Sequence, residues 1–222
     1  MGGVALKRGA ILGVVLAGGQ SRRFGQDKAV ARIGADRLIE RVVARATPQV
    51  AAMAVSGRDY GLCLPVIVDS GTSEGPLTGV LSSLRWAGRK GFSAVATFSC
   101  DAPFFPEDLV ARLASELRGD AACIYARSCG GRHPIFACWR VRALPDLERC
   151  YDDGVRALKT VQDRLEAVAI DFPEGPAPDG DMFFNINHPL DGIRAGRWLE
   201  DHRNSPCLAG RHAAPPGTVT VQ

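Results

Sequence analysis

The residues with the clearest chemical potential form a glycine-rich, cationic loop near the start of the chain. The stretch "VVLAGGQSRRFGQDKA", residues 14–29, passes from an apolar run into glycines and basic side chains. Gly18 and Gly19 lack side chains, so the backbone there can approach a base or a phosphate closely. Exposed amides after a strand can also cradle anions. Positive charge follows at Arg22, Arg23 and Lys28. The loop predicts a triphosphate site, with a solvated surface turn as the alternative.

This loop matches neither of the two common nucleotide fingerprints. A Walker A loop requires GxxxxGK[ST], whereas Gly25 is followed here by Gln26 and Asp27. The dinucleotide pattern GxGxxG is also absent. The prediction therefore depends on the density of glycine and charge directly after a buried strand.

Asp101 is the second candidate, because it follows the apolar run "AVATFS" and lies in the apolar segment "FSCDAPFF". A carboxylate in such surroundings is costly unless it is paired, hydrogen-bonded or bound to a metal. Mg²⁺ is usually held by one or two carboxylates together with substrate phosphates. Asp101 is therefore predicted to hold Mg²⁺, with a helix cap before Pro106 as the alternative.

Further polar groups stand at other predicted strand ends. Asp69 ends "VIVDS" and could orient a ribose or base or share the metal, although a turn-forming aspartate is equally consistent. "GPLTG", residues 75–79, pairs two glycines around a helix start, whose free amides suit an anion or a base edge. In "FFNINHP", Asn185 and Asn187 alternate with apolar residues, so both are expected on one side of an extended segment. They could bind a polar heterocycle or simply form a turn before Pro189.

These candidates need a scaffold that brings strand ends together. Strands are expected at 11–17, 50–55, 64–68, 94–99, 121–126, 133–139 and 166–171. Helices are expected at 36–46, 77–87, 105–117, 141–151, 154–165 and 189–202. This alternation predicts a doubly wound, mostly parallel sheet with helices on both faces. Ligands bind such sheets at the carboxyl ends of the strands, where the candidates stand.

Length and composition limit the alternatives. The chain has 222 residues, of which 46% are hydrophobic and 23% charged, with a net charge of +3. We expect one domain over residues 1–203 and a flexible tail over 204–222. The small net charge gives no indication of a nucleic-acid or membrane binder, and no apolar run approaches the roughly 20 residues of a membrane span. The seven cysteines form no CxxC pair and are expected as small buried hydrophobes in a reducing compartment, the cytoplasm.

Taken together, these motifs resemble the molybdenum cofactor guanylyltransferases, a MobA-like nucleotidyltransferase family. "LAGGQSRRFGQDKA" is similar to the family loop LAGGxSxRMGxDK, and "GPLTG", "CDAPF", "HPIFA" and "FFNINHPLD" resemble its other blocks in the same order. The resemblance covers roughly Ile11 to His202. It implies a Rossmann-like three-layer αβα nucleotidyltransferase fold with a mostly parallel sheet.

The resemblance also implies an activity: transfer of GMP from GTP to the phosphate of Mo-molybdopterin, with release of pyrophosphate and a requirement for Mg²⁺. It implies transient contacts with molybdopterin-synthesis proteins and with apo-molybdoenzymes or their chaperones. Lys28, Asp101 and Arg23 would be catalytic, and Asp101 would hold the metal. The residues that would contact nucleotide or pterin are Leu16, Ala17, Gly18, Gly19, Ser21, Arg22, Gly25, Lys28, Ser56, Asp69, Gly75, Pro76, Leu77, Gly79, Asp101, Asn185 and Asn187.

The chain departs from the family pattern at a few positions. Phe24 replaces a methionine, Ser56 and Gly57 replace an asparagine-containing stretch, and His188 replaces a threonine. A serine hydroxyl at this place can replace one hydrogen bond of an amide but not both.

Three other functions were compared with the sequence. A CTP-dependent molybdopterin cytidylyltransferase would typically carry alanine where Gly18 stands, and glycine leaves more room for a purine. A non-catalytic nucleotide-binding accessory protein would not need both Lys28 and Asp101. A transferase acting on a sugar phosphate would lack the block with two asparagines.

Overall fold

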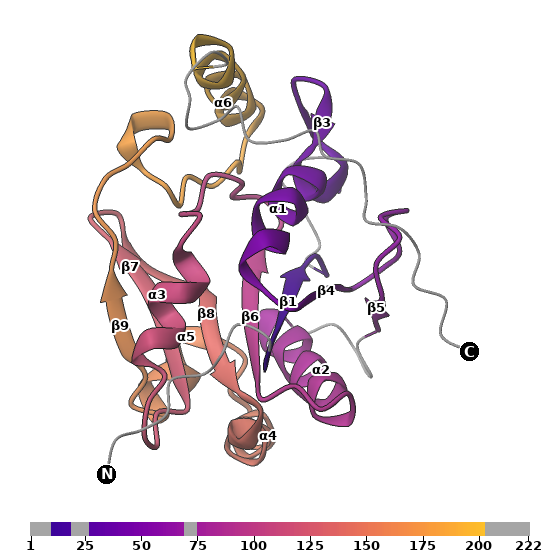
Figure 1. Cartoon of the computed structure of the whole chain (residues 1–222), viewed down its shortest axis with the longest axis vertical. Helices are drawn as coiled ribbons and strands as arrows, with labels where there is room; N and C mark the ends of the chain where they lie inside the picture. The colour runs from indigo at the N-terminus through magenta and orange to yellow at the C-terminus, as the bar shows by residue number, and fades with distance from the viewer. Residues whose placement is uncertain (1–9, 19–26, 69–74, 203–222) are drawn as a thin grey trace.

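The structure, a computed structural model, describes residues 10–18, 27–68 and 75–202. Its centre is a seven-stranded sheet in the order β5-β4-β1-β6-β8-β7-β9 (Figure 1). The strands are β1 (Ile11–Leu16), β4 (Ala52–Ser56), β5 (Val66–Ile67), β6 (Ala94–Ser99), β7 (Cys123–Ser128), β8 (Gly131–Arg140) and β9 (Val168–Asp171). Within this sheet β8 runs antiparallel to both neighbours, and the other neighbouring strands pair in parallel.

Alternate side chains of β1 enter two separate cores. Ile11 and Val15 pack on one face of the sheet, and Leu12 and Val14 pack on the other. The first core contains the apolar sides of α1 (Leu38–Ala46) and α3 (Leu109–Glu116). The second contains those of α2 (Pro76–Arg89), α4 (Leu144–Asp152) and α5 (Leu158–Arg164). Helices therefore cover both faces, and the predicted three-layer αβα fold with a mostly parallel sheet is confirmed.

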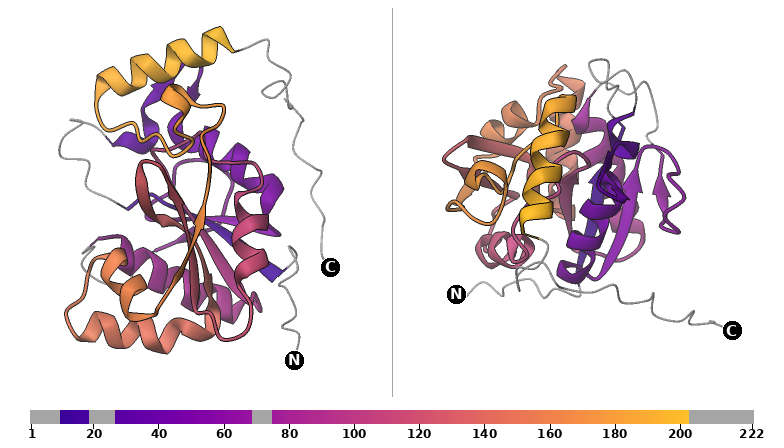
Figure 2. Two further views of the ribbon diagram at one scale, coloured as in Figure 1. Left: turned by 90° about the vertical axis from the view of Figure 1, so that its left-hand side faces the viewer. Right: turned by 90° about the horizontal axis from the view of Figure 1, so that it is seen from above.

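The last helix, α6 (Pro189–Asp201), lies beyond one end of the sheet beside a small hairpin of β2 (Arg32–Ile33) and β3 (Asp36–Arg37) (Figures 1 and 2). Trp198 of α6 packs edge-on against Phe104, which follows β6, with ring centroids 5.3 Å apart. The helix is thereby held over the segment that leaves the carboxyl end of β6.

Several predicted helix starts were wrong. The helix expected from 154 begins only at Leu158, and the one expected from 141 begins at Leu144, after a 3-10 turn. Asp36 and Arg37 pair in β3, so α1 begins at Leu38. The helix expected from residue 105 begins only at Leu109, because a buried glutamine side chain organises the segment before it. Gln49 Nε2 donates to the Pro106 carbonyl at 3.0 Å, and Gln49 Oε1 accepts from the Val110 amide at 3.0 Å.

The cysteine prediction holds in part. The six cysteines in the described ranges are free thiols; Cys123, Cys138 and Cys150 are buried as predicted, whereas Cys63 and Cys129 are exposed. No helix in the described ranges is long and apolar enough to cross a bilayer. The predicted tail, 204–222, lies outside the described residues.

Candidate active site

Lys28 occupies the start of a short 3-10 turn, Lys28–Val30, that follows the glycine-rich loop in sequence. Asp27 caps this turn, because its Oδ1 accepts from the Ala29 amide at 3.0 Å. The Lys28 amine donates to Asn187 Oδ1 at 2.6 Å and to Asp101 Oδ2 at 3.3 Å. The predicted phosphate-binding lysine therefore meets two residues from the other predicted motifs, 73 and 159 positions away in sequence.

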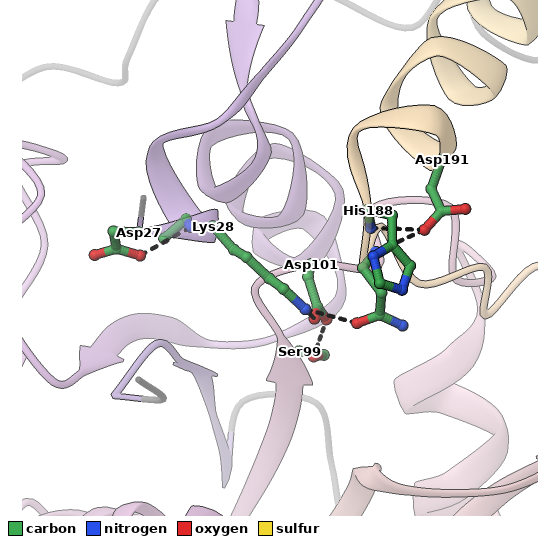
Figure 3. A network of polar contacts seen from close by, with 8 residues as sticks. Asp27, Lys28, Ser99, Asp101, His188 and Asp191 are labelled. Carbon is green, nitrogen blue, oxygen red and sulfur yellow. Dashed lines mark hydrogen bonds and ion pairs between the residues drawn. The ribbon is translucent and has the colours of Figure 1, made fainter. Parts of the chain in front are cut away.

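Asp101 lies just past the carboxyl end of β6, in the segment that passes under α6. Its Oδ1 accepts from the Ser99 hydroxyl at 2.5 Å, and its other oxygen faces Lys28 (Figure 3). The side chains of Lys28 and Asp101 are each 16% exposed, so the pair is partly shielded but still open to a ligand. The alternative of a helix cap fails, because Asp108 and not Asp101 is the N-cap residue of α3.

The segment with the two asparagines runs directly beside Asp101. The Ile186 amide donates to the Asp101 carbonyl at 2.9 Å, and the Ile186 side chain is buried between the exposed Asn185 and Asn187. Asp191, in the first turn of α6, accepts from the Asn187 and His188 amides at 2.9 and 2.8 Å. The two asparagines are thus exposed on either side of a buried residue, as predicted, and Asp191 of α6 holds the end of the segment that leads into the helix.

The end of β1 carries the start of the glycine-rich loop. The Ala17 amide donates to the Ser56 carbonyl at 3.0 Å, which keeps the ends of β1 and β4 together. Gly57 adopts φ +128°, and a Cβ there would lie 3.2 Å from the Gly18 amide nitrogen. The Gly57 found in place of the family's asparagine stretch therefore permits a close backbone approach to Gly18.

The start of α2 lies close to these strand ends. Gly75 is its N-cap and Pro76 its first residue, so a helix does start within "GPLTG" as predicted, one position before the expected residue 77. A Cβ at Gly79 would lie 3.0 Å from Ser56 Oγ and 3.2 Å from a Leu16 methyl group. Glycine at 79 thus lets this helix approach the edge at which the candidate residues gather.

Burial controls the ionisation of groups around this edge. It is the main cause that raises the pKa of the Cys100 thiol to about 12, and the neighbouring Asp101 charge adds to it. Cys100 therefore stays a neutral thiol and is not an activated nucleophile. The arrangement supplies one amine, one carboxylate and carboxamides at the carboxyl edge of the sheet, which suits charge neutralisation at phosphates better than covalent catalysis.

Known proteins share this arrangement of sequence and fold. The family model for the MobA-like NTP transferase domain matches residues 13–168. The chain belongs to this family. A molybdenum cofactor guanylyltransferase from Rhizobium leguminosarum bv. trifolii is 41% identical over 201 residues, which are 88% of this chain and 96% of the relative.

Further proteins are similar to this chain in sequence or in fold. A molybdenum cofactor guanylyltransferase from Rhodobacter capsulatus is 39% identical over 191 residues, 83% of this chain and 94% of the relative. The crystal structure of molybdopterin-guanine dinucleotide biosynthesis protein A from Archaeoglobus fulgidus superposes with a TM-score of 0.66 at 24% identity, covering 86% of this chain and 99% of the other, and bears on the fold alone. The family resemblance predicted from the motifs is confirmed.

Not every predicted site residue of this MobA-like protein can be placed. Gly19, Ser21, Arg22, Arg23, Gly25 and Asp69 lie outside the described residues, and their roles stay predictions. Ser56 is 1% exposed and Leu77 is fully buried, so their side chains lie inside the domain. A ligand contact at Leu77 would have to come from its backbone.

Sequence reasoning missed several residues that support the site. Tyr60 donates its hydroxyl toward the Ala17 carbonyl and the Asp27 carboxylate, at 2.9 and 3.0 Å. Asp191 could have been found from its position three residues after His188, the spacing of a capping box. No comparable local signal marks Tyr60, because its partners are distant in sequence.

Proposed function

We propose that this protein is a molybdenum cofactor guanylyltransferase, which transfers GMP from GTP to the terminal phosphate of Mo-molybdopterin. The observation that carries the proposal is the convergence of Lys28, Asp101 and Asn187 at the carboxyl edge of β6. Each comes from a different block of the family pattern. Relatives that carry the name molybdenum cofactor guanylyltransferase match 83–88% of this chain.

In the proposed reaction, a phosphate oxygen of the pterin forms a bond to the α-phosphorus of GTP. The bond from that phosphorus to the bridging oxygen breaks, and pyrophosphate leaves with the electron pair. The attacking phosphate is already anionic, so no strong general base is required. Binding and orientation then provide most of the catalysis.

Lys28 is the described cation best placed for the triphosphate. Its amine is held from two sides, so it is pre-oriented before the nucleotide arrives. A lysine ammonium is a compact charge that can neutralise several phosphate oxygens in turn. We assign it to GTP binding and to the charge that develops on the leaving pyrophosphate, together with Arg23, whose placement is not described.

Asp101 fits a magnesium ligand. The described residues contain no group of three or more histidine, cysteine or acidic side chains that could enclose a metal by themselves. Mg²⁺ commonly takes one or two carboxylates and completes its shell with phosphates and water. Ser99 orients one Asp101 oxygen, and the carboxylate stands at a ligand-binding sheet edge. When bound, the ion would neutralise phosphate charge.

The pterin side of the site is assigned to Asn185 and Asn187. Both are exposed, and both flank the Ile186 amide that is bonded to the Asp101 carbonyl. Their carboxamides can donate to and accept from a polar heterocycle. This arrangement would place the pterin phosphate beside the carboxylate and the amine.

GTP is the proposed nucleotide, and CTP is the main competitor. Gly18, which leaves room for a larger base, and the names of the relatives both favour GTP. We further propose that the protein works in the cytoplasm, where its free thiols would stay reduced. There it would meet molybdopterin-synthesis proteins and apo-molybdoenzymes or their chaperones.

The deciding experiment incubates the full chain with Mo-molybdopterin, Mg²⁺ and GTP labelled in the α-phosphate, with parallel reactions that contain labelled CTP. Label in a pterin guanine dinucleotide, with equimolar pyrophosphate, is the expected result. A clear preference for CTP would reassign the base. Tight GTP binding without transfer would indicate the accessory, non-catalytic protein instead.

A further inference from the structure

Tyr60 lies outside every family motif, yet it contacts both described ends that flank the glycine-rich loop. Its hydroxyl is 2.9 Å from the Ala17 carbonyl, at the end of β1, and 3.0 Å from Asp27 Oδ2, which precedes Lys28. The side chain is 7% exposed. One buried hydroxyl therefore stands between the strand that presents the loop and the turn that presents the lysine.

The hydroxyl is a permanent donor in this position. Burial, together with the charge of Asp27, raises the pKa of Tyr60 to about 12, so the phenol keeps its proton at neutral pH. A single proton is shared between a carbonyl and a carboxylate, and both are acceptors only. Replacing the hydroxyl with hydrogen would leave the carbonyl of the buried Ala17 and the carboxylate of the partly exposed Asp27 facing an apolar ring edge.

Tyr60 is itself held in place by other elements. Its carbonyl accepts from Arg37, directly before α1, at 2.8 Å. Arg58 pairs with Asp27 at 2.5 Å and lies 5.1 Å from the Tyr60 ring centroid. With the hydrogen bond between Ala17 and Ser56, these contacts make residues 56–60 a support for the end of β1.

We propose that Tyr60 is a positioning residue of this active site, which sets the place of the Lys28 amine by tying Asp27 to the end of β1. Its expected effect on catalysis rests on the function proposed above. Tyr60 touches no reacting atom in this scheme. It acts through Asp27, whose carboxylate caps the turn that begins with Lys28.

The direct test is Tyr60→Phe, which keeps the ring and removes the hydroxyl. The first measurement is the rate at which an amine-acylating reagent modifies Lys28 in the ligand-free chain, followed by mass spectrometry. Lys90, exposed at the end of α2, serves as the internal reference. We expect Lys28 to react about three- to tenfold faster in the variant, the range of one lost hydrogen bond.

The matched control is Tyr125→Phe. Tyr125 lies on β7, away from Lys28, and is also buried. Its hydroxyl accepts a hydrogen bond from Arg132 at 2.6 Å. Acylation of Lys28 should be unchanged in this control. If Tyr60→Phe does not fold, Arg58→Met replaces it, because the Arg58 side chain is 62% exposed and its loss removes the outer contact to Asp27.

Kinetics provide the second measurement. Tyr60→Phe should raise the KM for GTP about three- to tenfold while kcat changes less than about twofold, because a misplaced lysine weakens nucleotide binding. A merely structural role would lower kcat through the active fraction and leave KM unchanged. Equal Lys28 acylation in the wild type, Tyr60→Phe and Arg58→Met would overturn the positioning role. A wild-type chain that does not turn over GTP would refute the proposed function instead, and the acylation result would still decide the role of Tyr60.

Discussion

Two pairs of a cation and a carboxylate in the described residues, one at the ends of neighbouring strands and one in the candidate active site, differ in almost every respect. Arg127 of β7 and Asp171 of β9 are neighbours across the sheet, joined by two hydrogen bonds of 2.6 and 2.7 Å. Their side chains are 51% and 68% exposed. Lys28 and Asp101 approach only to 3.3 Å, yet each is just 16% exposed.

The better geometry belongs to the pair without a proposed function. The bidentate contact between Arg127 and Asp171 satisfies both partners and leaves little reason for a ligand to enter. Lys28 and Asp101 are instead held in place by other residues. Ser99 contacts Asp101, Asn187 contacts Lys28, and Asp27 caps the turn that begins with Lys28. A carboxylate has about four lone-pair sites, so Asp101 can still accept a metal ion. A loose contact between well-anchored partners is thus a better mark of a binding site than a perfect ion pair.

The largest expected difference between the two pairs is in turnover. Asp101→Asn keeps the shape of the side chain and removes its charge, so we expect kcat to fall by about 10³-fold or more while GTP binding stays measurable. The matched change on the other pair, Asp171→Asn, should alter kcat less than about twofold. Steady-state assays and calorimetry with GTP measure both. Full activity in Asp101→Asn would remove this carboxylate from the mechanism.

The next difference is in nucleotide affinity. Lys28→Ala should weaken GTP binding by about 100-fold but guanosine binding by less than about twofold, because the amine acts on phosphates and not on the base. Arg127→Ala serves as the control for loss of a cation at a strand end, and it should change neither affinity. Equal losses for GTP and guanosine in Lys28→Ala would show that the lysine supports the fold of the loop rather than the phosphates.

Substitutions of the two asparagines should distinguish effects on pterin binding from effects on GTP binding. Asn187→Ala should raise the KM for both the pterin and GTP by about tenfold, because Asn187 accepts directly from the Lys28 amine. Asn185→Ala should raise the KM for the pterin alone. Kinetics with each substrate varied in turn distinguish the two variants. Identical effects on GTP would mean that the contact of Asn187 with Lys28 does not help to place the lysine.

Much of this arrangement follows from local sequence, because strand ends carry the polar groups and apolar runs mark the strands. The positions of β1 and β6 were predicted from continuous apolar runs, and Asp101 follows from its place after one of them. The direction of β8 did not follow, because an apolar run looks the same in parallel and antiparallel neighbours. The pair of glycines at 130–131 was the available sign of a hairpin, and Ser128 indeed pairs with Gly131.

The parts of the site that escaped prediction all depend on tertiary contacts. The hydrogen bond between Lys28 and Asn187 joins residues 159 positions apart, and no local pattern connects them. Tyr60 lies in the irregular segment between β4 and β5, where no periodicity identifies a buried side chain. Burial of that hydroxyl beside Asp27 is a property of the packed domain, so single-sequence reasoning had no observation from which to infer it.

Tyr60, which lies near the Lys28–Asp101 pair, should make the stability of the protein depend on pH in the alkaline range. Its folded pKa of about 12 exceeds the ordinary value of 10.0, so the folded state holds this proton more tightly. The resulting stabilisation is complete below pH 10 and is lost as the pH rises from 10 to about 12. The melting temperature of the wild type should therefore fall more steeply across this range than that of Tyr60→Phe. Tyr125→Phe should retain the steep fall of the wild type, and parallel curves for the wild type and Tyr60→Phe would contradict the burial of a protonated phenol.

The smallest expected effect belongs to the pair with the ideal geometry. Arg127→Gln should lower the melting temperature by less than about 2 °C, since exposed ion pairs contribute little and are screened by salt. Hydrogen bonds from Arg127 hold the pKa of Asp171 below its ordinary value of 3.8, so the contribution of the pair is present above that pH and lost as the pH falls through the folded pKa. Melting curves of the wild type and Arg127→Gln should therefore differ slightly at pH 7 and converge in acid or in 1 M salt. A large difference at pH 7 that disappears in acid would mean that this exposed pair stabilises the domain after all, and that contact geometry is a better guide to its energetic weight than exposure.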